Sequence, residues 1–194
     1  MKNNENNHIQ EVLREIRDER LRLIHPPELK TGPKDLETVR FYASCDQGCQ
    51  MVLERAKSIM TILNDKAEHW PSLAEWRKIM PDWFIERCAP EMTKKEVDTW
   101  LENRRTRIKE DLEEAVARDW TLSGFLFWMK PDMRQWFWWD ARVFYGDGGK
   151  TYIGIAVSVF DWPFAWESLG WLFKAAGANE LLDEDELYGE EESN

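Results

Sequence analysis

The spacing of apolar and polar residues changes several times along this chain. Over residues 8–24 the apolar side chains recur at roughly 3.6-residue intervals, and charged residues fill the remaining faces. This spacing predicts an amphipathic helix. The helix is expected to end at His25, because the following Pro26 and Pro27 cannot continue it and disfavour helical geometry in the residue before them.

A second long helix is predicted from about Pro33 or Asp35 to Leu63, since proline is well tolerated in a first helical turn. Gly48 is a weak point in the middle of this segment, where a break or kink is possible. The two helices together predict an antiparallel helical hairpin over residues 1–66.

Shorter helices follow, and two of them begin with a capping signal. Ser72 lies three residues before Glu75, and Thr93 lies three residues before Glu96, which is the spacing of the capping box. The second signal is predicted to begin a long, highly charged helix that runs to roughly Arg118.

The apolar period becomes two between residues 136 and 160, where two arms rich in β-branched and aromatic residues flank the turn GDGG. This pattern predicts a β-hairpin. Strict alternation puts one set of side chains on the open face: Trp136, Trp138, Asp140, Arg142 and Phe144. It puts the other set in the core: Phe137, Trp139, Val143, Ile153, Ile155 and Val157. A helix with Gly177 as its C-cap is predicted to follow.

The resulting fold class is α+β and mainly helical. We expect three regions: an N-terminal amphipathic helical hairpin over 1–66, a Trp-rich α+β domain over 67–179, and an acidic disordered tail over 180–194. In the second region a small antiparallel sheet, formed by the hairpin at about 136–160, packs on helices, because two strands alone are only marginally stable.

Composition adds an excess of tryptophan and an uneven charge distribution. The chain of 194 residues has 12 tryptophans, eight of them between Trp120 and Trp171. Its net charge is −11, and residues 180–194 carry eight acidic and no basic side chains. With no strongly basic segment, direct binding to nucleic acid is disfavoured. The acidic tail instead favours a basic protein partner.

The sequence also favours a cytoplasmic protein, and we expect a bacterial or phage origin. The first residues contain no apolar leader segment, and the apolar runs are far shorter than a bilayer requires, so no membrane association is predicted. Three cysteines are too few, and odd in number, for a disulfide framework, which is typical of a reducing compartment.

Candidate metal and catalytic residues are few. Cys45 and Cys49 share a helical face, and together with His69 and Cys88 they would make four zinc-type ligands. A second closely spaced pair is missing, so these cysteines are interpreted as small buried residues. No phosphate-binding loop or nucleophile motif is present. We therefore predict no metal, no cofactor and no catalytic residue.

The candidate binding site lies in the Trp-rich segment. A carboxylate within WWDARVF is costly unless it is paired, and Arg142 is the expected partner of Asp140 on the same face. The rings of residues 162–166 are expected either to close the core or to form an aromatic pocket for an apolar or cationic ligand. Six residues are predicted to bind the partner: Trp136, Trp138, Asp140, Arg142, Trp162 and Trp166.

The function predicted from these features is that of a non-enzymatic protein-binding protein. An immunity protein, an inhibitor or a dedicated chaperone that sequesters a basic partner fits the aromatic and arginine-rich surface best. One alternative is a hydrolase-like enzyme that uses Asp140 or Cys88 in an aromatic pocket. Another is a structural subunit that associates with itself, and the N-terminal helices are a possible homodimer surface.

Overall fold

The computed structural model describes residues 2–27, 36–46, 48–96, 98–99, 120–145, 151–160 and 163–183. The helices with defined bounds are α1 (Lys2–Ile24), α2 (Cys49–Asp65), α3 (Leu73–Ile79), α4 (Asp82–Ile85), α7 (Leu122–Met129) and α8 (Glu167–Ala176). The strands are β1 (Glu37–Ser44), β2 (Trp136–Tyr145), β3 (Thr151–Val159) and β4 (Glu180–Asp183). The predicted α+β class with an antiparallel sheet is confirmed.

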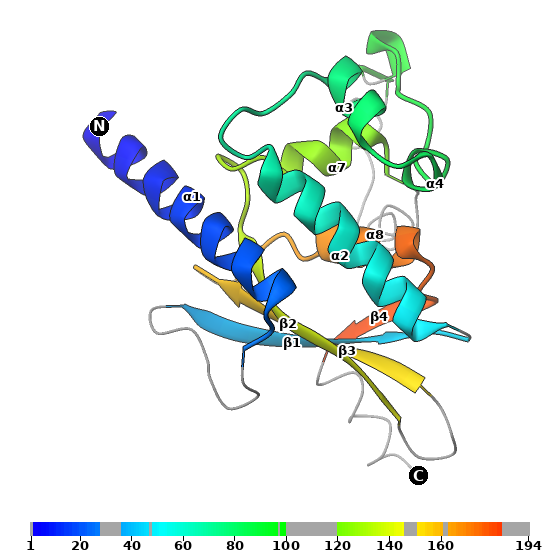
Figure 1. Ribbon diagram of the computed structural model, residues 1–194. Coiled ribbons are helices and arrows are strands. Elements are labelled where there is room, and N and C mark those ends of the chain that lie inside the picture. Colours follow the sequence, from blue (N-terminus) through cyan, green and yellow to red (C-terminus); the bar gives the residue numbers. More distant parts are fainter. Residues whose placement is uncertain are drawn as a thin grey trace.

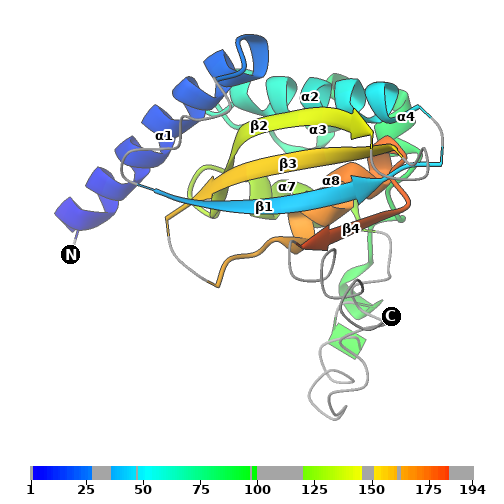
Figure 2. The same cartoon turned by 90° about the horizontal axis from the view of Figure 1, so that it is seen from below.

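The four strands form one antiparallel sheet in the order β2-β3-β1-β4 (Figures 1 and 2). The chain from β1 through α2 to β2 therefore passes over β3, and the chain from β3 through α8 to β4 passes over β1. Both connections are split β-α-β units, in which a third strand lies between the two that the helix joins. The predicted hairpin of β2 and β3 accounts for one half of this sheet.

Strand β1 replaces the first part of the predicted second helix, which is a correction to the helical hairpin over 1–66. Val39, Phe41 and Ala43 point toward the core, and the residues between them point the other way. The segment ETVRFYAS is rich in β-branched and aromatic residues, which suit a strand. Because β1 lies between β3 and β4, the N-terminal third of the chain contributes a central strand to the sheet.

The break that Gly48 suggested in the sequence is real. Gly48 adopts a left-handed conformation (φ 75°) at the N-cap of α2, a conformation that glycine adopts without steric cost. Its carbonyl accepts the first hydrogen bond of the helix, from the Val52 amide at 3.1 Å. Helix α2 therefore begins at Cys49 and runs to Asp65, close to the predicted end at Leu63.

Both predicted capping boxes are present. The Ser72 hydroxyl accepts from the Glu75 amide, and the Glu75 carboxylate accepts from the Ser72 amide at 2.8 Å. Thr93 and Glu96 form the same pair, with the Thr93 amide donating to Glu96 at 2.7 Å. Most of the charged helix predicted after Thr93, to Arg118, lies outside the described residues.

The main core lies between one face of the sheet and helices α2 and α8 (Figure 1). Trp138 stacks on Phe173 of α8 with ring centroids 5.8 Å apart, and helix α2 buries Val52, Ala56 and Ile59 in the same layer. A smaller cluster joins α1 to the beginning of β2. No helix in the described part of the chain is long and apolar enough to cross a bilayer.

The last strand corrects the predicted start of the acidic tail. Helix α8 ends at Gly177, whose φ of 115° makes it the predicted C-cap. Residues Glu180–Asp183 then pair with β1, with Tyr42 opposite Leu182. The polypeptide returns to the sheet here because Leu181 packs against the core. Residues 184–194, the remainder of the predicted tail, lie outside the described residues.

Candidate functional site

A bulge in β2 reverses which of its side chains face the core. Trp138 pairs with Val157, and the next pair is Asp140 with Ala156, so Trp139 is an extra residue without a counterpart in β3. A β-bulge of this kind interrupts the two-residue alternation of a strand. As a result, Trp136 and Trp138 lie on the same face as Ala141 and Val143.

Trp136 and Trp138 are therefore core residues, and their predicted role as exposed partner-binding residues is wrong. Both side chains are buried. The Trp136 indole N–H donates to Ser168 Oγ on α8 at 2.8 Å. Trp138 stacks on Phe173 at an interplanar angle of 17°. Burial on the helix-covered side leaves neither indole available to a partner.

The two aromatic residues on the other side of this segment contact α1. Phe137 is buried as predicted, but it packs against Val12 and Ile16 of α1 rather than against α2 and α8. Trp139 is half-buried, and the Arg22 guanidinium lies over its ring at 4.7 Å from the centroid. The apolar stripe of α1, which the sequence left as a possible dimer surface, thus packs within the chain.

The α1 side of β2 is fixed by a buried ion pair. Nη2 of Arg134 donates to both carboxylate oxygens of Glu19, at 2.5 and 2.7 Å, and both side chains are almost completely buried. The Trp138 amide also donates to Glu19, and Arg22 Nε donates to the Trp138 carbonyl at 3.0 Å. These contacts satisfy both backbone polar groups of Trp138 at the outer edge of β2, where the described part of the chain has no further strand.

Burial raises the pKa of the Glu19 carboxyl, while the Arg134 guanidinium and the Trp138 N–H oppose that rise. Burial likewise lowers the pKa of Arg134, and Glu19 opposes the change. Arg134 also donates from Nη1 to the Asn64 side-chain carbonyl at 3.0 Å. The arrangement is a structural anchor between α1, α2 and β2, because no exposed surface remains for a ligand.

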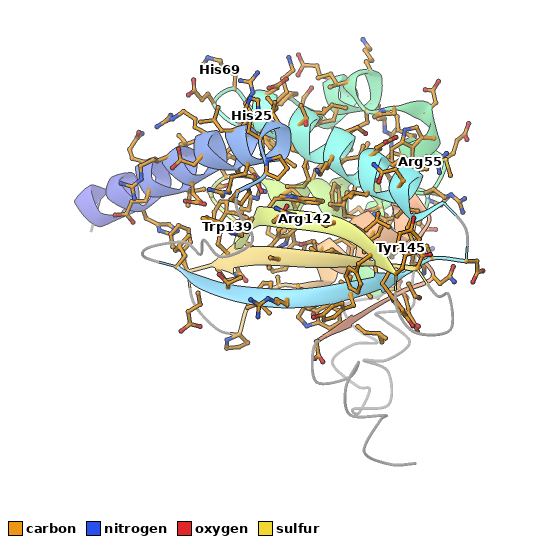
Figure 3. The ribbon with its side chains drawn as sticks, turned by 60° about the horizontal axis from the view of Figure 1, so that its bottom comes forward. His25, Arg55, His69, Trp139, Arg142 and Tyr145 are labelled. Atoms are coloured by element: carbon orange, nitrogen blue, oxygen red, sulfur yellow. The ribbon has the colours of Figure 1, made fainter. Side chains whose placement is uncertain are left out.

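The predicted Asp140–Arg142 ion pair is confirmed. Arg142 Nε lies 2.7 Å from Asp140 Oδ2, and Arg142 Nη2 donates to the Pro27 carbonyl at 2.7 Å. The Arg142 side chain is 42% exposed and that of Asp140 is 12% exposed. Figure 3 shows Arg142 beside the end of α1, from which Pro27 follows. Arg142 thus remains available to a partner, whereas Asp140 mainly holds it in place.

Of the two remaining predicted partner residues, Trp162 and Trp166, only Trp166 is described by the structure. Trp162 lies outside the described residues. Trp166 is half-buried and stacks on Phe41 of β1, with ring centroids 6.2 Å apart at 25°. It also lines a pocket beside α8 and β4. The two outcomes predicted for this aromatic segment, core closure and pocket formation, both apply to Trp166.

The sheet face turned away from α2 and α8 carries a cluster of rings that strict alternation did not identify. In Figure 2 the strands run across the view with α2, α3, α7 and α8 behind them. We call the side chains on the part of this face that no described helix covers the open face: Arg40, Tyr42, Asp140, Arg142, Phe144, Tyr152 and Gly154.

Three rings from three strands meet on the open face. Phe144 of β2 contacts Tyr42 of β1 edge-on at 5.8 Å and stacks with Tyr152 of β3 at 6.2 Å. Phe144 crosses directly above Gly154, where an added Cβ would lie 2.5 Å from its Cε1 atom. The absence of a side chain at Gly154 is what allows the ring to come this close to the backbone. Phe144 keeps 38% of its surface exposed.

The candidate metal and nucleophilic side chains occupy other places. Cys45 and Cys49 are both buried, where β1 ends and α2 begins, and burial together with a hydrogen bond to Cys49 raises the pKa of Cys45 to about 12. Cys88 Sγ donates to the Phe84 carbonyl at 3.4 Å in α4. Among the described residues, no three His, Cys, Asp or Glu side chains gather closely enough to hold a metal ion.

Comparisons with protein-family models, with curated proteins and with solved structures give no match, so a function is inferred below from the residues of this chain alone.

Proposed function

We propose that this chain is a non-enzymatic protein-binding protein that sequesters a basic protein partner, as an immunity protein or a dedicated chaperone does, and that the partner docks on the open face. The observation that carries the proposal is the ring cluster of the open face, in which Phe144 is exposed and Tyr42 and Tyr152 are half-buried, with no described helix over it. Exposed apolar patches on a sheet are typical of interaction sites.

The arrangement of the open face supports a protein partner over a small molecule. The rings lie at the end of the face next to the β2-β3 connection, and the charged side chains of Arg40 and Arg142 lie beside them toward the middle of the strands. Aromatic residues and arginine are the types that contribute most to binding at protein interfaces. The rings lie on regular strands and touch one another, so little side-chain entropy is lost when a partner covers them.

The acidic end of the chain supports a basic partner. Glu180 and Asp183 belong to β4, at the edge of the sheet next to β1. Six of the eleven residues that follow Asp183 are acidic, and none is basic. Negative charge concentrated in one segment increases the rate of encounter with a positive surface more than it increases final affinity.

The test is affinity capture of the tagged chain from its native lysate, followed by titration of the purified captured protein. The expected result is one stoichiometric basic protein whose affinity falls about tenfold or more with Tyr152→Ala, since central interface rings contribute about 2 kcal/mol. The matched control is Phe127→Ala, an exposed ring on α7. Equal affinity of the two variants would count against the open face.

A second variant separates the effect of the acidic C-terminal charge from the effect of direct contacts on the open face. Removing residues 184–194 leaves β4 intact and removes six of the eight acidic residues. Association with the partner should slow at low salt, while dissociation stays unchanged. If association is equally fast with and without these residues, electrostatic steering by the tail is wrong.

A further inference from the structure

A tryptophan-lined pocket lies beside β4, on the side of the sheet covered by α8. Its volume is about 150 Å³. We call it the Trp pocket, and the residues of interest in its lining are Trp120, Trp166, Glu167, Trp171, Lys174 and Glu180. An apolar cavity of about this volume holds a molecule of the size of benzene. The Trp pocket therefore fits one compact head group.

The lining has the chemistry of a site for an organic cation. The face of an indole ring carries negative electrostatic potential, and tryptophan attracts cations more strongly than tyrosine or phenylalanine. Three tryptophans and Glu167 line this pocket, together with Glu180, whose side chain turns to the other face of the sheet with its register partner Ser44. The Glu167 carboxylate forms no ion pair with a guanidinium or ammonium group in the described part of the chain.

One positively charged side chain, that of Lys174, already lies against a tryptophan of the pocket. The Lys174 ammonium lies 5.9 Å from the centroid of the Trp171 ring. This contact shows that a positive group is accommodated against an indole of the pocket. It also means that Lys174 offsets the negative charge that Glu167 provides. A cationic ligand would therefore bind more tightly if the charge of Lys174 were removed.

The location of the pocket links it to the open face. Glu180 belongs to β4, and the Ser44 hydroxyl of β1 donates to its carboxylate at 3.2 Å. Ser44 lies in register beside Tyr152, which is one of the three rings of the open face. A partner that covers these rings thus reaches the β4 edge, and the pocket lies around this edge, on the α8 side of the sheet.

We propose that the Trp pocket binds the cationic head group of a lysine or arginine side chain from the protein partner. This assignment rests on the proposed function for the identity of the ligand, but the cation preference of the pocket is a property of the isolated chain. The head group would lie against the indoles, with the carboxylate of Glu167 compensating its charge.

The pocket is tested first without a partner. The full chain is labelled with ¹⁵N and titrated with methylguanidinium chloride or with the neutral isostere methylurea, at constant ionic strength. The indole N–H signals are assigned with single Trp→Phe variants. Saturable shifts are expected at the signals of Trp120, Trp166 and Trp171 with methylguanidinium, and smaller non-saturating shifts with methylurea. Equal responses to the two probes, or saturable shifts confined to other indoles, would overturn the proposal.

Charge variants then test the role of individual side chains. Glu167→Gln should weaken methylguanidinium binding about threefold or more, and Lys174→Gln should strengthen it by a similar factor, in keeping with the size of exposed cation–π and charge interactions. Glu86→Gln makes the same charge change at an exposed residue after α4. If Glu86→Gln weakens binding as much as Glu167→Gln, the effect is one of total charge and the assignment fails.

The captured partner provides the final test, which is separate from that of the proposed function. Tyr152→Ala should weaken partner binding without changing the methylguanidinium titration. Glu167→Gln should weaken both. If Tyr152→Ala has no effect on the partner, the open-face proposal fails while the pocket titration stands. If Glu167→Gln binds the partner as tightly as the unmodified chain, the assignment of a partner side chain to the pocket is overturned.

Discussion

Glu19 of α1 and Arg134, just before β2, form an ion pair that is sealed from solvent, with Arg134 Nη2 at 2.5 and 2.7 Å from the two carboxylate oxygens. The two residues lie far apart in the sequence, and the pair joins the N-terminal helix to the Trp-rich half of the chain. Glu19 also receives the Trp138 amide. The Glu19 carboxylate therefore forms an ion pair with Arg134, and its oxygens accept hydrogen bonds from both Arg134 and Trp138.

Replacing Glu19→Gln should destabilise the protein by about 3–5 kcal/mol, because it leaves the Arg134 charge buried without a counter-ion. The amide oxygen of glutamine still accepts from Trp138, but the amide NH2 cannot accept from Arg134, so the loss combines the missing charge with one missing hydrogen bond. Urea unfolding followed by circular dichroism measures the change. Glu68→Gln, which breaks the exposed pair with Arg17, is the control and should cost about 0–1 kcal/mol. Equal losses for the two variants would contradict the structural role of the buried pair.

The bulge at Trp139 leads to a second prediction. Trp138→Ala should cost about 3–5 kcal/mol, since it empties a buried site against Phe173. Trp139→Ala should cost clearly less, because that ring is half-buried under Arg22. Thermal and urea unfolding give the order of the two losses. Strict alternation along β2 requires the opposite order, so a larger loss from Trp139→Ala would refute the bulge.

Gly154 should tolerate no side chain while Phe144 is present. Gly154→Ala would place a methyl group 2.5 Å from the Phe144 ring, and we expect a loss of about 1–3 kcal/mol as the ring is displaced. In a Phe144→Ala background the same substitution should cost much less. The coupling is measured by a double-mutant cycle in urea. Additive losses would mean that the ring does not lie on this glycine.

The cysteines should differ sharply in reactivity. With its pKa raised to about 12 by burial, the Cys45 thiol stays protonated from pH 7 to pH 9, and the thiolate is the form that reacts. Iodoacetamide at pH 8.5 should therefore modify the half-buried Cys88 well before Cys45, as judged by peptide mass spectrometry. In urea all three cysteines should react at similar rates. Labelling of Cys45 as fast as Cys88 in the folded protein would contradict its burial.

Local signals in the sequence predicted those elements that depend on local interactions. The capping boxes at Ser72 and Thr93, the α1 stripe, the C-cap at Gly177 and the β2-β3 hairpin are all present, since each depends on residues a few positions apart. The prediction of the Asp140–Arg142 pair holds despite the bulge, because both residues come after the bulge in β2. Their two-residue spacing is unaffected by the extra residue at Trp139.

The features that were missed depend on distant partners. The apolar positions of residues 37–44 are compatible with either a helix or a strand. Pairing with β3 stabilises the strand. A bulge is not visible in an alternating run of aromatics, so Trp136 and Trp138 were assigned to the wrong face. The open face joins Tyr42, Phe144 and Tyr152 from three strands, and no local pattern relates them. The alternation of Val39, Phe41 and Ala43 and the β-branched and aromatic composition of this segment are the local signals for β1.

The strand order has a consequence for how the protein is made. The two central strands, β1 and β3, come from opposite ends of the chain, and Phe41 of the first pairs with Ile155 of the second. During synthesis both edges of β1 therefore remain unpaired until most of the polypeptide, including β3 and β4, has left the ribosome. Such long-range pairing slows folding and leaves strand edges exposed to aggregation. Helix α2, which completes its own hydrogen bonds, is the first neighbour able to shield the nascent strand.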